Sequence, residues 1–261
     1  MNIHTIDAHT HVNMMETAQQ GAVIQRALDK EIGIINAGAD EVSSLRAVEL
    51  ARAYTQGVWA TVGYHPHEAL KKLDIDLLKN LARDERVVGI GECGLDYFNL
   101  DKENGSETKR KQKELFELHI SLVHELKKPL VIHCREAFPD VIEILEKHKD
   151  ILLPEAGILH FFTGTIEDAR ALLKLGFSFT FGGLVTFNRS FDEILTSIPL
   201  ERILAETDAP WVAPKSYRGK QNEPSYIPEV VEWLAKIKNV PEEEMGGILL
   251  ENTKRVFKLD F

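Results

Sequence analysis

The sequence predicts an α/β protein, a single (β/α)₈ barrel of the TIM type that spans residues 1–261. Eight short apolar runs alternate with segments of helical periodicity along the whole chain. This alternation is typical of a parallel sheet covered by helices. The chain of 261 residues also has the length of one such barrel, about 250 residues. Since no G-x-G-x-x-G pattern follows the first run, an open nucleotide-binding sheet is disfavoured.

The expected strands are short apolar runs of the kind that are buried on both faces of a parallel sheet. They cover residues 3–7, 32–37, 58–62, 87–91, 130–132, 157–159, 177–181 and 203–205. The expected helices have an apolar residue at every third or fourth position. They cover residues 18–30, 41–56, 75–83, 107–126, 138–148, 166–175 and 191–197, followed by 227–238 and 241–258.

The longest irregular stretch, residues 208–226, follows the last expected strand directly and is rich in proline, glycine and polar residues. Long loops inside compact domains usually carry function. In a barrel this loop would lie over the C-terminal ends of the strands, where active sites are found.

Composition limits the function classes. The net charge of −10 argues against a protein that coats nucleic acid, because such binding depends on lysine and arginine replacing counterions. It leaves room for a nuclease, since bound cations offset charge locally. Two cysteines, no secretory signal and no long apolar stretch predict a cytoplasmic protein without membrane attachment. No sequence feature indicates an obligate protein partner.

Six side chains of metal-ligand type follow the expected strands, at the positions where a barrel carries its active site. They are His9, His11, Glu92, His133, His160 and Asp208. Imidazoles and carboxylates bind divalent metal ions. Any one of these residues alone could be a capping or buried hydrogen-bonding group. Their occurrence at five separate strand ends predicts a metal site.

Six ligands are too many for one four-coordinate catalytic ion, which leaves a position open for water. We therefore expect two divalent ions with one carboxylate between them, an arrangement that activates water for hydrolysis. Asp208 is placed to accept a proton from that water. Phosphoryl chemistry favours Mg²⁺, whereas a site rich in histidine also accepts Zn²⁺, Mn²⁺ or Ni²⁺.

Neighbouring residues have expected supporting roles. By strand alternation Asp7 and Glu206 lie on the same side as the ligands and are predicted to orient imidazoles. Cys93 and Cys134 have the opposite parity and are predicted to face the helices as small buried apolar groups.

Six sequence motifs resemble the TatD family of metal-dependent deoxyribonucleases, a branch of the amidohydrolase-like barrels. The resemblance covers essentially the whole chain, and the Gly-Glu-x-Gly-Leu-Asp-Tyr and Glu-Thr-Asp-Ala-Pro motifs are specific to the family. The motifs are Asp-Ala-His-Thr-His at 7–11, Gly-Tyr-His-Pro-His at 63–67, Gly-Ile-Gly-Glu-Cys-Gly-Leu-Asp-Tyr at 89–97, His-Cys-Arg at 133–135, His-Phe-Phe-Thr-Gly at 160–164 and Glu-Thr-Asp-Ala-Pro at 206–210.

The resemblance implies how the ligands divide between the two ions. One ion would be bound by His9, His11 and Asp208, the other by His133 and His160, with Glu92 bridging them. The implied activity is 3′–5′ exonucleolytic hydrolysis of DNA phosphodiester bonds, with single-stranded or frayed DNA ends as the substrate.

The resemblance also places His65 against the substrate phosphate. Two positions depart from the family pattern: Asn13 stands where an acidic residue is usual, and His119 where a glutamine is usual. Neither residue is a proposed ligand. The departures therefore leave the expected chemistry in place and bear on the substrate preference.

Two arginines near the expected strand ends, Arg135 and Arg218, are candidates for holding phosphate, because a guanidinium group binds phosphate with two parallel hydrogen bonds. Trp211, three residues after Asp208, could stack on a base or could anchor its loop.

Two rival functions remain open. Metal-activated water also attacks carbonyl carbon, so the substrate could be a small amide, lactone or ester rather than DNA. The chain could also be a non-catalytic metal-binding protein, although none of the expected ligands is missing.

Overall fold

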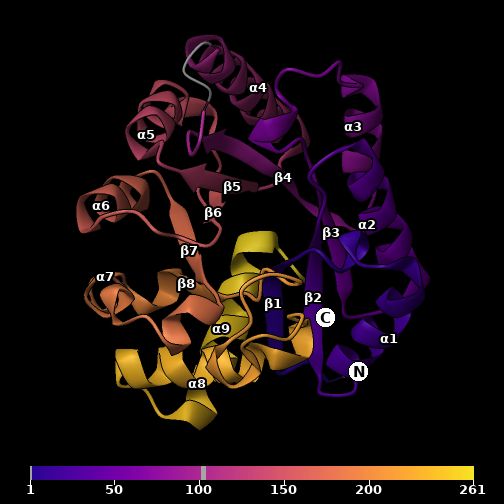
Figure 1. Cartoon of the computed structure of the whole chain (residues 1–261), viewed down its shortest axis with the longest axis vertical. Helices are drawn as coiled ribbons and strands as arrows, with labels where there is room; N and C mark the ends of the chain where they lie inside the picture. The colour runs from indigo at the N-terminus through magenta and orange to yellow at the C-terminus, as the bar shows by residue number, and fades with distance from the viewer. Residues whose placement is uncertain (1, 101–103) are drawn as a thin grey trace.

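A computed structural model of the chain describes residues 2–100 and 104–261. The described residues form a sheet of eight parallel strands in the order of the chain, from β1 to β8, with helices on the outside (Figure 1). The strands are β1 Thr5–Thr10, β2 Ile32–Ala37, β3 Val58–Val62, β4 Val87–Asp96, β5 Leu130–Arg135, β6 Gly157–Leu159, β7 Phe177–Phe181 and β8 Ile203–Ala205. Five of the eight have the predicted bounds.

The sheet closes where the first strand meets the segment that follows the last. The backbone N–H of Asp208 donates to the carbonyl of His9 at 3.0 Å, and that of His11 donates to the carbonyl of Ala209 at 2.7 Å. The carboxylate of Asp7 accepts from the backbone N–H of Thr207 at 2.8 Å. These bonds join the two edges of the sheet, and the predicted (β/α)₈ barrel is confirmed.

The helices surround the strands and begin and end within three residues of the predicted positions. Side-chain caps fix some of these boundaries: Asp40 accepts from the backbone N–H of Ser43, and Thr165 from that of Asp168. The helices are α1 Thr17–Leu28, α2 Glu41–Ala53, α3 Ile75–Ala82, α4 Gly105–Leu126, α5 Phe138–Lys147, α6 Ile166–Lys174, α7 Asp192–Ser197, α8 Ile227–Lys238 and α9 Glu242–Phe257. Within the described ranges, none of them combines the length and apolarity needed to cross a bilayer.

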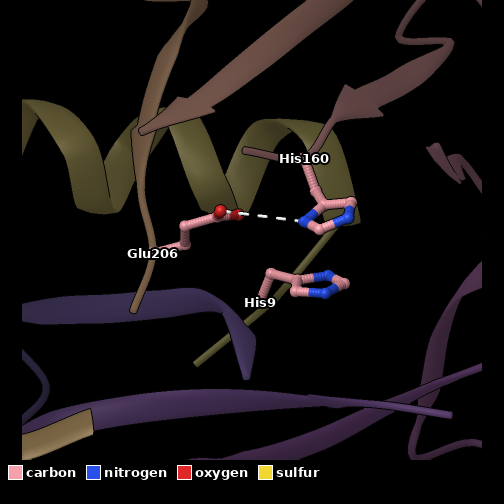
Figure 2. Close-up of side chains that lie close together, drawn as sticks. All are labelled: His9, His160 and Glu206. Atoms are coloured by element: carbon pink, nitrogen blue, oxygen red, sulfur yellow. Dashed lines mark ion pairs between the residues drawn. The ribbon is translucent and has the colours of Figure 1, made fainter. Parts of the chain in front are cut away.

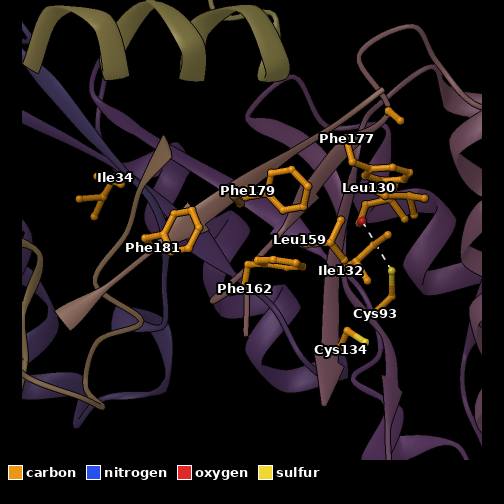
Figure 3. Packing of buried hydrophobic residues seen from close by; sticks show 14 of the residues in the cluster. Ile34, Cys93, Leu130, Ile132, Cys134, Leu159, Phe162, Phe177, Phe179 and Phe181 are labelled. Carbon is orange, nitrogen blue, oxygen red and sulfur yellow. Dashed lines mark hydrogen bonds between the residues drawn. The ribbon is translucent and has the colours of Figure 1, made fainter. Parts of the chain in front are cut away.

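The apolar core has two layers. An inner cluster joins residues of seven strands and of the segment before β1 to Val256 and Phe257 of α9, so this helix closes the barrel at the end opposite the C-terminal ends of the strands. A larger cluster fills the space between the strands and the outer helices, and Figure 3 shows part of it around Phe162 and Phe179. Cys93 and Cys134 belong to this outer layer, as predicted.

Three strands run beyond their predicted ends, because their pairing continues through polar residues. In the β4–β5 pair the register extends to Asp96 opposite Arg135. Glu92 and His133 therefore lie within strands rather than after them. In β1 the register shifts between Asp7 and Thr10, and beyond this shift the side chain of His9 points toward the mouth of the barrel.

Candidate metal centre

A cavity of about 360 Å³ opens at the C-terminal ends of the strands. It contains five of the six predicted ligands, and the sixth, His9, lies directly behind its wall with 1% of its surface exposed. The lining residues are His11, Met14, Ala39, Asp40, His65, His67, Glu68, Glu92, His133, His160, Asp208 and Trp211. The structure thus brings together residues from both ends of the sequence.

One group of ligand atoms comes from β1 and the segment after β8. The Nε2 atoms of His9 and His11 lie 3.0 Å apart, and Oδ1 of Asp208 lies 3.9 Å and 3.6 Å from them. Burial lowers the pKa of both imidazoles, which favours the neutral form that binds metal. Burial also raises the pKa of Asp208 well above its usual range. These three donors fit a divalent cation, whose positive charge would satisfy the converging lone pairs.

A second group comes from β5 and the end of β6. Nδ1 of His133 and Nε2 of His160 lie 3.2 Å apart, and each lies 3.0 Å from Oε1 of Glu92. The other oxygen, Oε2, lies 3.4 Å from Nε2 of His11 and 3.9 Å from that of His9. Glu92 therefore directs one oxygen toward each pair of imidazoles, the orientation expected of a carboxylate between two cations.

Glu92 is almost completely buried, and its pKa reflects two opposing effects. Burial raises the pKa of this carboxyl, but the nearby imidazoles of His160 and His65 hold it well below its usual range. The ionised form is the one that binds metal. The backbone fixes the position of Glu92 as well, because its N–H donates to the carbonyl of Gly38 at 2.8 Å.

Carboxylates hold the far sides of two imidazoles. Oδ2 of Asp96 lies 3.0 Å from Nε2 of His133. Oε1 of Glu206 forms a longer ion pair with Nδ1 of His160, at 3.7 Å and without a hydrogen bond, and Figure 2 marks this pair with a dashed line. Such partners fix the ring orientation and raise the basicity of the nitrogen that faces the metal. Burial lowers the pKa of His160, but Glu92 and Glu206 together raise it well above its usual range.

His9, His160 and Glu206 also lie close enough together to hold an ion by themselves. The rings of His9 and His160 stack at a centroid distance of 4.0 Å and an interplanar angle of 16° (Figure 2). Glu206, however, has no exposed surface, and its Oε2 accepts a hydrogen bond from Thr180. It can orient His160 but does not reach the cavity, in agreement with its predicted role.

Asp7 differs from its prediction. Its carboxylate reaches no imidazole and instead accepts from the backbone N–H and the hydroxyl of Thr207. The register of β1 against β2 shifts between Asp7 and Thr10, and Oδ1 of Asp7 also accepts from the backbone N–H of His9 at 3.4 Å. Burial raises the pKa of Asp7 to about 8, although the bonds from Thr207 lower it. Asp7 ties β1 to the end of β8.

Sequence reasoning missed Asp96 and three polar residues of the cavity lining, Asp40, His67 and Glu68. Asp96 holds His133, and its Oδ2 lies 3.4 Å from Nε2 of the exposed His67. Asp96 has the same strand parity as Glu92, so alternation would have identified it had β4 not been predicted to end at residue 91. His67 lies in one of the family-like motifs but has no apolar run directly before it.

The predicted substrate-binding residues occupy different places. His65 lines the cavity, with Nε2 at 3.6 Å from Oε1 of Glu92, and burial lowers its pKa to about 3. Arg135 and Arg218 lie outside the cavity lining. Their guanidinium groups stack on Phe98 at 3.4 Å and on Phe187 at 4.4 Å, respectively.

The two departures from the family pattern have structural roles. Asn13 donates hydrogen bonds to the carbonyls of Ala37 and Ser43. His119 accepts from the backbone N–H of Tyr64 at 3.0 Å. Neither side chain lines the cavity.

Comparison with known proteins places this architecture in a family. Residues 6–258 match the family described as TatD related DNase. A relative from Bacillus subtilis, the uncharacterized metal-dependent hydrolase YabD, is 38% identical over 97% of this chain and 99% of its own length. The 3′-5′ ssDNA/RNA exonuclease TatD of a Pantoea species is 34% identical over 91% of this chain and 92% of its own.

A solved structure agrees with these relatives. The TatD homologue YJJV of Escherichia coli superposes with a TM-score of 0.87 at 26% identity, and the match covers 100% of both chains. A TatD family hydrolase from Entamoeba histolytica has the same fold, with a TM-score of 0.82 at 22% identity over 98% of both chains. With its barrel and its converging imidazoles and carboxylates, the chain belongs to the TatD family of metal-dependent hydrolases.

Proposed function

We propose that this protein is a 3′–5′ exodeoxyribonuclease that hydrolyses terminal phosphodiester bonds of single-stranded or frayed DNA. The observation that carries the proposal is the position of Glu92, with one oxygen at each of two groups of imidazoles. Two cations held 3.5–4 Å apart suit in-line displacement at phosphorus, where attacking and leaving oxygens both need stabilisation. The relative from Pantoea, whose name describes an exonuclease, supports this choice of substrate.

The residues then have the following roles. His9, His11 and Asp208 would bind one divalent ion and His133 and His160 the second, with Glu92 as a ligand of both. A pair of divalent cations supplies Lewis acidity toward phosphoryl oxygens and lowers the pKa of a bound water. Asp208 accepts the proton of the attacking water, because Oδ1 is close to both imidazoles of its group and its side chain reaches the cavity.

Three cationic or hydrogen-bonding side chains bind the substrate. His65, which lines the cavity beside Glu92, donates to the phosphate that is cleaved. Arg135 and Arg218 lie outside the cavity, each with its guanidinium group over an aromatic ring, and a guanidinium held there can still donate through its N–H groups. We assign them to the phosphates of neighbouring nucleotides.

The metal in function is Mg²⁺, in keeping with phosphoryl transfer chemistry. Four imidazole donors also suit Zn²⁺, Mn²⁺ or Ni²⁺ and would take up these ions when they are abundant. The cysteines are free and buried, which fits a protein that works in the cytoplasm.

The proposal is tested with purified, metal-depleted protein and a single-stranded oligonucleotide labelled at its 5′ end. Addition of Mg²⁺ or Mn²⁺ should produce a ladder that shortens from the 3′ end, and EDTA should stop it. A parallel panel of RNA, lactone and amide substrates defines the alternative. Turnover of a lactone or an amide, with no shortening of DNA in any metal, would refute the nuclease assignment and favour a carbonyl substrate.

A further inference from the structure

One side of the metal cavity carries two large apolar side chains that the chemistry does not use. Trp211 and Met14 line the cavity and are 47% and 45% exposed. Each lies three residues after a proposed ligand of the same cation, Asp208 and His11. Exposed apolar area of this kind inside a polar cavity is unfavourable in water and often marks a ligand contact.

Trp211 does not serve as the anchor of its loop. The loop is held through the backbone: the N–H of Trp211 donates to the carbonyl of Asp208 at 3.0 Å, and its carbonyl accepts from Nδ2 of Asn222 at 2.7 Å. Asn222 is 1% exposed, and its Nδ2 also donates to the carbonyl of Thr207 at 2.8 Å. An anchoring indole would be buried, as Trp59 is at 8% exposure.

The indole is nevertheless held in a defined place. Its ring meets that of His11 edge to face, at a centroid distance of 5.1 Å and an angle of 67°. The short 3₁₀ helix Val12–Met14 follows His11 directly and brings the thioether of Met14 to the same cavity. The cavity thus has apolar groups beside the His9–His11–Asp208 group, and it has His65 and His67 among its other lining residues.

We propose that Trp211 is a stacking platform for the terminal nucleobase of the substrate, with Met14 contacting the same base. This inference rests on the proposed nuclease function and specifies how the DNA end is recognised. With the terminal base on the indole, the phosphate on its 5′ side, which joins it to the preceding nucleotide, would lie toward the metal ligands and His65 in the same cavity. Only an unpaired base can leave its neighbours to stack there, so the platform selects single-stranded and frayed ends over blunt duplexes.

The test compares two oligonucleotides that differ only in the 3′-terminal residue, which is a normal nucleotide in one and an abasic analogue in the other. Stacking on an aromatic side chain contributes enough to change KM by between about fivefold and a hundredfold. We expect Trp211→Ala to raise KM by this factor for the normal end and to leave KM for the abasic end unchanged. Trp211→Phe, which keeps an aromatic face, should recover most of the difference.

A binding measurement supplies a second readout. An oligonucleotide with a non-hydrolysable phosphorothioate 3′ end should quench the tryptophan fluorescence of the wild type, and the abasic version should not. The quench should vanish in Trp211→Phe and persist in Trp233→Phe, a control on α8 whose indole lies against Arg189 and Lys236.

The outcomes separate the two proposals. Equal losses of Trp211→Ala on normal and abasic ends, or no loss on either, would overturn the platform while leaving the nuclease intact. If the wild type releases no nucleotide from either end with any divalent ion, the nuclease assignment itself fails, and the platform fails with it.

Discussion

Nε2 of His9 lies 3.0 Å from Nε2 of His11, so the two imidazoles direct these nitrogens toward one point. Nδ1 of His11 lies 3.0 Å from the carbonyl of Ala37 and must donate to it, so its Nε2 carries a lone pair. Nδ1 of His9 is buried, and no hydrogen-bond partner for it lies among the described residues. A cation between the two Nε2 atoms would make use of both lone pairs.

Metal loading should therefore stabilise the fold. Because the ion binds the folded chain and not the scattered ligands of the unfolded one, stability should rise by about 2.7 kcal/mol at a free metal concentration of 100 times Kd. Calorimetry of EDTA-treated protein, with and without added Mn²⁺, measures this as an increase in Tm. His11→Ala should lose the part of the increase that comes from the His9–His11–Asp208 group, and His124→Ala, on the exposed side of α4, should keep all of it. Identical Tm values in the wild type with and without metal would rule out binding at this site.

Asp208→Asn should separate catalysis from stability. Loss of the proton acceptor should lower kcat by about 10²–10⁴-fold. Burial raises the pKa of Asp208, so the ionised carboxylate disfavours folding of the metal-free protein at any pH above its usual pKa of 3.8. A neutral amide of the same shape avoids this cost. We expect the metal-free variant to melt at the same temperature as the metal-free wild type or higher. Substantial remaining turnover would remove Asp208 from the mechanism.

The sequence predicted the fold and the ligand positions because both depend on short-range patterns. Alternating apolar runs determine the barrel, and ligand-type residues directly after such runs meet at its mouth. Pairing between strands cannot be predicted from such patterns, since it joins residues that are far apart in the sequence. Asp7 bonds Thr207, which lies 200 residues further along the chain, and the extension of β4 to Asp96 depends on its pairing with β5. These two features account for the wrong role of Asp7 and the missed role of Asp96.

Asp96 should control how tightly metal binds, although it does not line the cavity. Its Oδ2 accepts from Nε2 of His133, while Oδ1 accepts from the backbone N–H of Phe98 at 2.9 Å. An asparagine has only one acceptor oxygen and can keep only one of these bonds. Such outer partners usually contribute 10–100-fold to metal affinity or activity.

We therefore expect Asp96→Asn to weaken metal binding by about this factor in a competition titration with a chelator. Asp140→Asn is the matched control, because Asp140 pairs with Lys113 and Tyr97 and does not touch an imidazole. Unchanged affinity in Asp96→Asn would show that His133 holds its orientation without a carboxylate.

His119 should make the fold sensitive to mild acid. The side chain has no exposed surface; Nε2 accepts from the backbone N–H of Tyr64, and Nδ1 donates to the carbonyl of Leu115. A proton on Nε2 would break the first bond and place a charge in the core. Burial accordingly lowers the pKa of His119 from 6.5 to about 4.

Between pH 4 and 6.5 the unfolded chain thus binds a proton at this position that the folded chain does not. By linkage, the contribution of neutral His119 is complete above pH 6.5 and is lost as the pH falls toward 4, to a total of about 3 kcal/mol. His119→Gln keeps an acceptor for Tyr64 but cannot titrate. The measurement is urea unfolding of both metal-free proteins at several pH values. The difference between their free energies of unfolding reports the contribution of His119, because the contributions of His9, His11 and His65 are the same in both proteins. The free energy of unfolding of the wild type should fall more steeply below pH 6.5 than that of the variant. Parallel curves would mean that His119 remains neutral in both states or finds a new partner when protonated.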